Sequence, residues 1–225
     1  MHSLARPRVA LALASLTLVA ACLDFDKFQV EGETTPECPT EVPATGCLLA
    51  PIDFDIDPVP VLANPLSVAA CGSADRCIRI AAKSGAKTDA KFDDDAAALD
   101  AACTGQMTLF SAAEGTFSYF AFVSPTERIE VAYRPGTVRF IVGTEVSSQD
   151  IDAADVVDTL RIRRDGDSLV LDALAGDTSV ACLTKDAPEL VAQSFEVHFG
   201  VDARQDEGVE GQSTLFDAYG LPASP

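Results

Sequence analysis

The sequence has no tryptophan, only three tyrosines and few basic residues, and these shortages narrow the range of functions. The absence of tryptophan weakens the case for sugar binding by aromatic stacking. Lysine and arginine number 16 against 35 aspartates and glutamates, which gives a formal net charge of −19 at pH 7. Because so acidic a surface repels phosphate groups, we expect no nucleic acid partner.

Residues that bind zinc are also scarce. No C-x-x-C pair occurs, and His198 is the only histidine after residue 21. Structural zinc sites combine closely spaced cysteines and histidines. We therefore expect the cysteines to form disulfides and predict no metal site from them.

The first 21 residues have the layout of a cleaved signal peptide. Arg6 and Arg8 provide positive charge, and the run 9–19 that follows is apolar apart from Ser15 and Thr17. This run is shorter than the stretch of about 20 helical residues that spans a bilayer. We therefore expect it to be removed.

Val19-Ala20-Ala21-Cys22 resembles the lipobox of bacterial membrane lipoproteins. The resemblance implies a diacylglycerol on the Cys22 sulfur, an acyl chain on its new amino group, and stable anchoring by several chains together. The alternative is an ordinary signal peptide. Enteric lipoproteins that are retained in the inner membrane carry aspartate after the cysteine, whereas this chain has Leu23. Leucine at this position favours the outer membrane as the location in the cell envelope.

The chain has seven cysteines, and lipidation of Cys22 explains the odd number. The six that remain predict three disulfides outside the cytoplasm, with fifteen connectivities open. Proximity in sequence favours the pairs Cys38–Cys47, Cys71–Cys77 and Cys103–Cys182.

We divide the chain into a signal peptide (1–21), an acidic tether (22–47) and one domain (48–225). In the tether, six acidic residues oppose Lys27, and three prolines discourage regular structure. The rest of the chain is long enough to bury a sizeable core.

Alternation of apolar and polar residues predicts strands at 77–81 and 195–201, and further runs predict strands at 106–112, 116–123 and 213–219. The run 116–123 is apolar on both faces, as expected of a central strand. For Asp93 to Cys103, both a short helix and a loop remain open.

Two turn signals predict hairpins with definite registers. Pro135-Gly136 suits a type II turn and places Tyr133 opposite Val138 on the core face. Asp165-Gly166 suits a type I′ turn and places Ile162 opposite Leu169. Many antiparallel strands with little helix predict a β-sandwich.

The order of strands from Thr116 to Tyr219 resembles the concanavalin A-like (laminin G-like) jelly-roll superfamily. The resemblance is carried by an arginine-rich hairpin, a late strand that ends in glycine and a closing Phe-Asp strand, at 160–167, 195–201 and 216–219. It implies an all-β, antiparallel jelly-roll sandwich, and it covers about half of the chain after the signal peptide.

Known catalytic patterns are missing or misplaced. Jelly-roll glycosidases carry E-x-D-x-x-E, with two carboxylates that flank the scissile bond, and no such stretch exists here. Gly166-Asp167-Ser168-Leu169 matches the GDSL esterase motif, but it falls in a predicted hairpin, and Phe195 replaces the aspartate expected three residues before His198. We therefore predict that the protein is not an enzyme.

Asp53-Phe54-Asp55-Ile56-Asp57 resembles the start of a calcium-binding loop. Pro58 and Asn64 occupy the positions where an EF-hand needs glycine and glutamate. We therefore predict no cofactor, with calcium at an irregular site as the alternative.

Arginines on the non-core faces of the two hairpins are the candidate ligand-binding residues, because guanidinium groups bind carboxylate and phosphate in a forked geometry. The alternative is local pairing with the many acids. The candidates are Arg134, Arg139, Arg161 and Arg163.

Together these features predict a lipid-anchored envelope module that binds a glycan or a protein without catalysis. The alternatives are a structural lipoprotein without a small ligand and a hydrolase acting on glycans. The sequence does not identify the ligand, the side of the membrane that the domain faces, or the oligomeric state.

Overall fold

The computed structural model describes residues 52–53, 66–71, 76–91, 97–98, 104–191 and 194–219, all within the unit 36–225. The predicted lipobox and tether, Cys22, Cys38, Cys47 and Cys103, and the loop residues Asp55 and Asp57 lie outside this part. No helix in the described ranges is long and apolar enough to cross a membrane.

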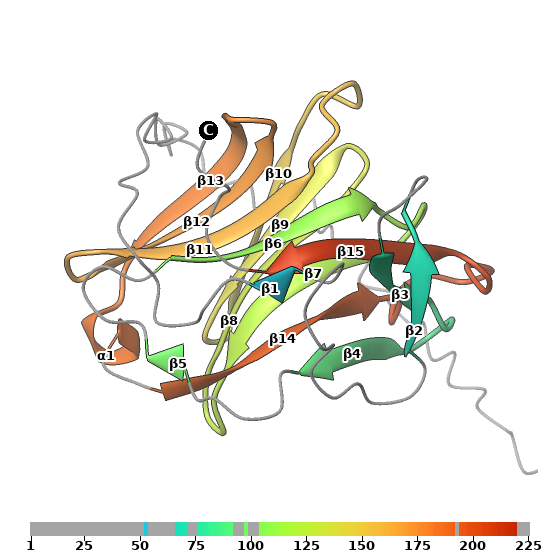
Figure 1. The fold of residues 1–225 in the computed structure, drawn as a ribbon. Coiled ribbons are helices and arrows are strands. Elements are labelled where there is room, and N and C mark those ends of the chain that lie inside the picture. The colour runs from blue at the N-terminus through green and yellow to red at the C-terminus, as the bar shows by residue number, and fades with distance from the viewer. Residues whose placement is uncertain are drawn as a thin grey trace, which may run out of the picture. The chain divides into compact units, whose positions relative to one another are not determined.

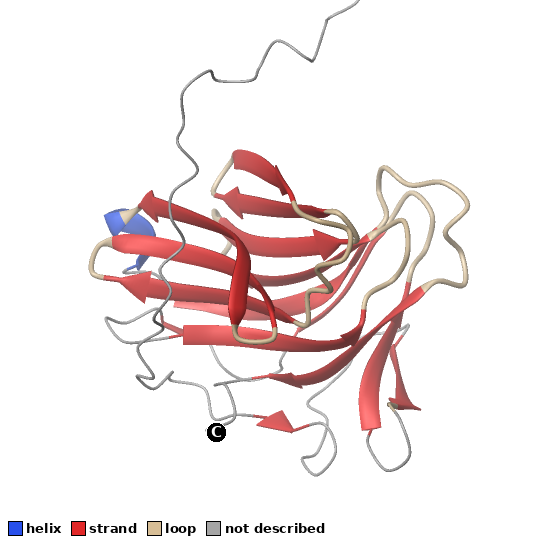
Figure 2. Cartoon of the chain, turned by 90° about the horizontal axis from the view of Figure 1, so that it is seen from above, coloured by secondary structure: helices blue, strands red, loops and turns tan. Residues whose placement is uncertain are grey.

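Antiparallel strands form two sheets (Figures 1 and 2). The eight-stranded sheet has the order β13-β12-β11-β6-β15-β3-β2, with β1 also paired to β15. Its strands are β1 (Ile52–Asp53), β2 (Leu66–Ala70), β3 (Arg76–Ala81), β6 (Thr104–Ser111), β11 (Thr159–Asp165), β12 (Ser168–Ala175), β13 (Thr178–Asp186) and β15 (Ser213–Tyr219).

The seven-stranded sheet has the order β10-β9-β8-β7-β14-β4, with β5 also paired to β14. Its strands are β4 (Lys87–Lys91), β5 (Ala97–Ala98), β7 (Phe117–Val123), β8 (Arg128–Arg134), β9 (Thr137–Val142), β10 (Glu145–Asp150) and β14 (Ser194–Asp202). The one helix of the described ranges is α1 (Pro188–Val191). This arrangement confirms the predicted all-β sandwich.

The core lies between the two sheets, and strands such as β9 and β14 contribute alternate residues to it. Phe199 of β14 and Phe216 of β15 meet edge to face, with ring centroids 5.0 Å apart, and so join the two sheets. The predicted central strand is confirmed, because β7 lies between β8 and β14 and has six of its seven residues buried.

The first hairpin has the predicted register. Tyr133 pairs with Val138, Val131 with Phe140 and Ile129 with Val142, and all six side chains are buried. Gly136 takes a φ of +85°, which suits the glycine position of the expected turn.

The second hairpin has a register that differs from the prediction. Asp165 pairs with Ser168, so the two loop residues are Gly166 and Asp167, and Ile162 pairs with Leu171 instead of Leu169. Gly166 has a φ of +62°, and no non-glycine residue described has a positive φ. A type I′ turn requires positive φ at both central residues, so Asp167 rules it out and the glycine takes the first loop position. The shift is an even number of residues, and the core face is therefore unchanged.

The sequence from Asp93 to Cys103 is compatible with either a short helix or a loop. Its described part, β5, is a short strand paired with Ser194 and Phe195 of β14. The other residues of this stretch lie outside the described ranges.

Candidate functional site

The candidate site lies on the outer face of the seven-stranded sheet, which we define as the face turned away from the core. Directly paired residues share a face, so Ala121, Glu130 and His198 lie together here, as do Tyr119, Ala132 and Gly200. A second apolar cluster covers the middle of this face and consists of Phe117, Tyr119, Ala121 and Ala132. Charged side chains surround that cluster.

Glu130 is the most deeply buried charge on the outer face, with no exposed surface. Its Oε2 lies 2.7 Å from Lys87 Nζ and 2.6 Å from Arg128 Nε, and its Oε1 lies 3.0 Å from Arg139 Nη2. Burial favours the neutral acid, but Lys87 and Arg128 outweigh it and hold the pKa of Glu130 below its usual value. Glu130 therefore stays ionised and organises three cations, and it is not accessible to a substrate.

The Tyr119 ring lies against two of these cations, Lys87 and Arg128. Its centroid is 3.8 Å from Lys87 Nζ and 5.2 Å from the Arg128 guanidinium carbon, distances at which cation–π attraction operates. Burial raises the pKa of Tyr119 well above its usual value, so the ring keeps its neutral hydroxyl. Burial also lowers the pKa of Lys87, although Glu130 opposes this effect.

Accessible carboxylates on this face lie at the junction of β4 and β14, which are neighbours in Figure 1. His198 Nδ1 lies 2.8 Å from Asp89 Oδ2, and Nε2 lies 3.1 Å from Glu196 Oε2. The carboxylate side chains are 42% and 53% exposed, against 13% for His198. A hydrogen bond from His198 holds the pKa of Asp89 below its usual value, and bonds from Lys91 and His198 do the same for Glu196.

This arrangement is suited to proton transfer. Both His198 hydrogen bonds to carboxylate oxygens form at once only when both ring nitrogens carry a proton. The depressed pKa values keep Asp89 and Glu196 as acceptors. His198 lies between two exposed carboxylates, so a group that can give or take a proton stands beside two acceptors.

At the other end of β14, Asp202 lies at a pocket of about 230 Å³. Its carboxylate accepts hydrogen bonds from Arg139 and Arg204, each with an Nη2 to Oδ2 distance of 2.8 Å. Burial would raise the pKa of Asp202, but the bonds from Arg204 and Arg139 lower it strongly. The pocket is lined by Phe117, Arg134, Arg139, Asp202, Arg204, Gln205 and Asp206.

The structure separates the four predicted arginines into two pairs. Arg134 and Arg139 belong to the seven-stranded sheet and line the pocket. Arg161 and Arg163 belong to the eight-stranded sheet, on the opposite side of the sandwich. The non-core faces of the two hairpins therefore do not form one arginine-bearing surface. The hairpins were correctly recognised, but the sequence pattern could not show that they belong to different sheets.

Arg161 and Arg163 are also buried, each 3% exposed, and they share the carboxylate of Asp172. Asp172 Oδ2 lies 3.1 Å from Arg161 Nε and 3.4 Å from Arg163 Nε. Burial lowers the pKa of Arg161, and Asp172 opposes this effect. Local pairing with acids is the alternative stated for the four arginines. It describes this pair, and it also describes Arg139, which bonds Glu130 and Asp202.

Sequence reasoning missed Asp89, Glu130 and Asp202 as members of the site and treated His198 as an ordinary residue. The alternation of β14 does place Glu196, His198 and Asp202 on one face. Other contacts of the site are distant in sequence: Lys87 lies 43 residues from Glu130, Arg139 lies 63 from Asp202, and Asp89 lies 109 from His198. No local pattern reports such contacts.

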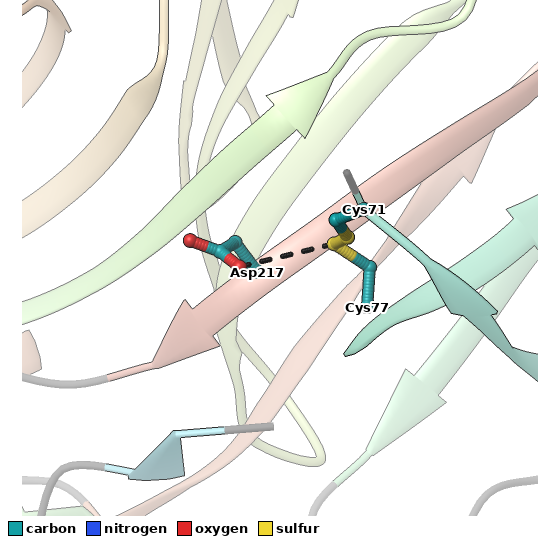
Figure 3. Close-up of side chains that lie close together, drawn as sticks. All are labelled: Cys71, Cys77 and Asp217. Atoms are coloured by element: carbon teal, nitrogen blue, oxygen red, sulfur yellow. Dashed lines mark hydrogen bonds between the residues drawn. A yellow bond between two sulfur atoms is a disulfide. The ribbon is translucent and has the colours of Figure 1, made fainter. Parts of the chain in front are cut away.

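Two cysteines and an aspartate form the single group of potential metal ligands found in the described ranges: Cys71, Cys77 and Asp217 (Figure 3). Cys71 and Cys77 are joined in a disulfide, the pair expected from their spacing, and Cys77 Sγ lies 3.8 Å from Asp217 Oδ1. Disulfide sulfurs are not thiolate ligands, so this group is not a metal site while the bond is intact. Cys182 is also disulfide-bonded, and its partner lies outside the described residues.

No protein-family model and no curated protein matches the chain in sequence. Solved structures do match in fold. A Crh5 transglycosylase in complex with NAG matches with a TM-score of 0.55 and 13% identity, over 80% of this chain and 87% of that chain. The apo form of Crh5 transglycosylase matches with a TM-score of 0.52 and 13% identity, over 83% and 90%.

A Bacillus licheniformis beta-glucanase is a more distant match, with a TM-score of 0.46 and 12% identity over 72% of this chain and 84% of that chain. The Crh5 matches support the concanavalin-like jelly-roll fold. They also contradict the predicted non-enzymatic binding module, because the matched proteins are transglycosylases.

Proposed function

We propose that the protein is a glycan-active enzyme that cleaves or transfers glycosidic bonds on the outer face of the seven-stranded sheet. The observation that carries the proposal is the pair of accessible carboxylates bridged by His198. The transglycosylases that share the fold supply the class of reaction. Because the chain has no E-x-D-x-x-E stretch, the catalytic groups must come from other positions. Asp89 and Glu196 are exposed candidates on this face, and His198 lies between them.

In this mechanism one N–H of His198 leaves its carboxylate partner and gives its proton to the glycosidic oxygen, as the bond from that oxygen to the anomeric carbon breaks. Glu196 or Asp89 accepts a proton from the attacking hydroxyl group as its oxygen bonds to the anomeric carbon. The attacking group is water in hydrolysis and a sugar hydroxyl in transfer. The proton then passes from the carboxylate to His198 along the existing hydrogen bond, which restores the starting state.

The full chain should shorten or extend labelled β-glucan, chitin or uronate-containing oligosaccharides, with products separated by chromatography. Glu196→Gln, Asp89→Asn and His198→Ala should each lower the rate about 100-fold or more, the contribution usual for a positioned acid or base. Glu145→Gln is the matched control, since Glu145 is also exposed and ion-paired but lies on β10. Full activity in the three site variants, or no conversion of any oligosaccharide by the wild type, would contradict the proposal.

We further propose that the enzyme acts in the cell envelope, held by a lipid on Cys22. The support is the lipobox-like stretch that ends at this residue. Cys22→Ser should abolish labelling by a radioactive fatty acid and move the protein from the membrane fraction to the soluble fraction. Cys182→Ser leaves the lipobox intact and should remain labelled. A Cys22→Ser protein that still carries the label would refute the anchor.

A further inference from the structure

We infer that the pocket beside Asp202 binds the carboxylate of an acidic sugar, so that the substrate class is a uronate-containing oligosaccharide. This inference rests on the proposed glycan activity and identifies its substrate. The pocket is built from β7, β8, β9, β14 and the loop after β14. It lies on the same outer face as His198.

The charge of the lining favours an anion. Three arginines face two aspartates, Asp202 and Asp206, in a chain whose net charge is −19. Asp202 is already saturated, because its Oδ1 accepts bonds from Arg204 Nε at 2.9 Å and Arg204 N at 3.3 Å, in addition to the two bonds to Oδ2. Arg139 also pairs with Glu130, so the weakly paired charge of the lining is that of Arg134. A single positive charge suits a carboxylate better than a doubly charged phosphate.

Arg134 is the group with free hydrogen-bonding capacity. Its side chain is 40% exposed, and its Nη1 lies 3.8 Å from Asp206 Oδ1, which is too long for a hydrogen bond. Its guanidinium carbon lies 4.7 Å from the Phe117 ring centroid, and that of Arg139 lies 4.3 Å away. Stacking on the ring orients Arg134 and leaves its donors available for a bidentate carboxylate.

Arg139 gives a second indication. Its side chain is 13% exposed, and its Nε is buried without a hydrogen-bond partner among the described residues. Unsatisfied buried donors are rare in folded proteins, and a water or ion at the site is one explanation for them. The Arg139 Nε–H is thus a donor beside the pocket that no described residue satisfies.

The position of the pocket sets the size of the ligand. Asp202 follows His198 by four residues on β14, about 13 Å at the usual rise of about 3.3 Å per residue. One monosaccharide bound at the pocket does not reach the histidine. An acidic oligosaccharide can place its carboxylate at Arg134 and a glycosidic bond at His198.

Calorimetry on the full chain tests the inference without turnover. The ligands are a glucuronate-containing oligosaccharide, the same oligosaccharide with its carboxyl groups reduced, and a phosphorylated oligosaccharide of equal length. We expect the glucuronate form to bind tightest. Arg134→Gln should weaken its binding about 10-fold to 100-fold, the usual loss for a charge-assisted hydrogen bond. The same variant should leave the reduced form unaffected.

Arg79→Gln is the matched control, because Arg79 is exposed and lies on β3 of the other sheet. It removes the same charge and should not change the binding. Equal binding of the acidic and reduced forms, preference for the phosphorylated form, or normal binding by Arg134→Gln would overturn the inference. Cleavage of a neutral oligosaccharide that is insensitive to Arg134→Gln would overturn it while leaving the proposed activity intact.

Discussion

Replacing Glu130 by glutamine should lower the free energy of unfolding by about 3 to 5 kcal/mol. Glu130 is fully buried and pairs with Lys87, Arg128 and Arg139. Glutamine keeps the size of the side chain but removes the charge, so three cations are left close together without their common carboxylate. Urea unfolding followed by circular dichroism measures the loss.

Glu145→Gln provides the control for this change, since Glu145 is 76% exposed and pairs with Lys185 at the surface. Surface pairs contribute about 0 to 1 kcal/mol. Because the folded pKa of Glu130 is depressed, its contribution is complete above the unfolded value near 4.3 and is lost as the pH falls through the folded value. The difference between wild type and Glu130→Gln should therefore narrow in acid. Equal losses for Glu130→Gln and Glu145→Gln would contradict the central role of this carboxylate.

Replacing Gly200 by alanine should separate β4 from β14. A Cβ at this position would lie 2.2 Å from Thr88 O and 2.8 Å from Asp89 Cα, both backbone atoms, and 2.9 Å from Tyr119 Oη. Such overpacking costs about 1 to 3 kcal/mol or more. The shift of β4 should also break the bond between Asp89 and His198, so activity should fall together with stability.

Gly136→Ala serves as the comparison, because Gly136 has open space around it and a φ of +85°. Alanine at this positive φ should lower the free energy of unfolding by about 1 to 2 kcal/mol, because its Cβ disfavours the left-handed backbone conformation. Thermal unfolding measures stability, and the NMR signals of the His198 ring report the contact with Asp89. We expect those signals to move in Gly200→Ala and to stay unchanged in Gly136→Ala. Unchanged His198 signals in Gly200→Ala would show that β4 is not displaced.

Several elements of the sandwich were predictable because the signals are local. Alternation identified β14, the run that is apolar on both faces identified β7, and Pro135-Gly136 gave the register of the first hairpin. The second register failed because an aspartate stands on each side of Gly166, and either Asp165 or Asp167 can share a two-residue loop with it. Only the folded backbone decides which one does.

The site was predictable only in fragments. Arg134 and Arg139 were identified as candidates, but Arg161 and Arg163 point to the other side of the sandwich and are buried against Asp172. The absence of E-x-D-x-x-E led to the prediction of a non-enzyme, which the fold comparison contradicts. One missing local motif does not exclude carboxylates that approach from separate strands.

The sequence by itself determined the acidic composition, the alternation that makes a β-sandwich, and the residues that each strand turns to one face. These properties depend on neighbours a few positions away. The tertiary structure alone decided which hairpin joins which sheet, and it placed Asp89 on β4 against His198 on β14 and Lys87 against Glu130. The physical reason is that strand order and long-range pairing depend on the packing of the whole core, which no short stretch of sequence specifies.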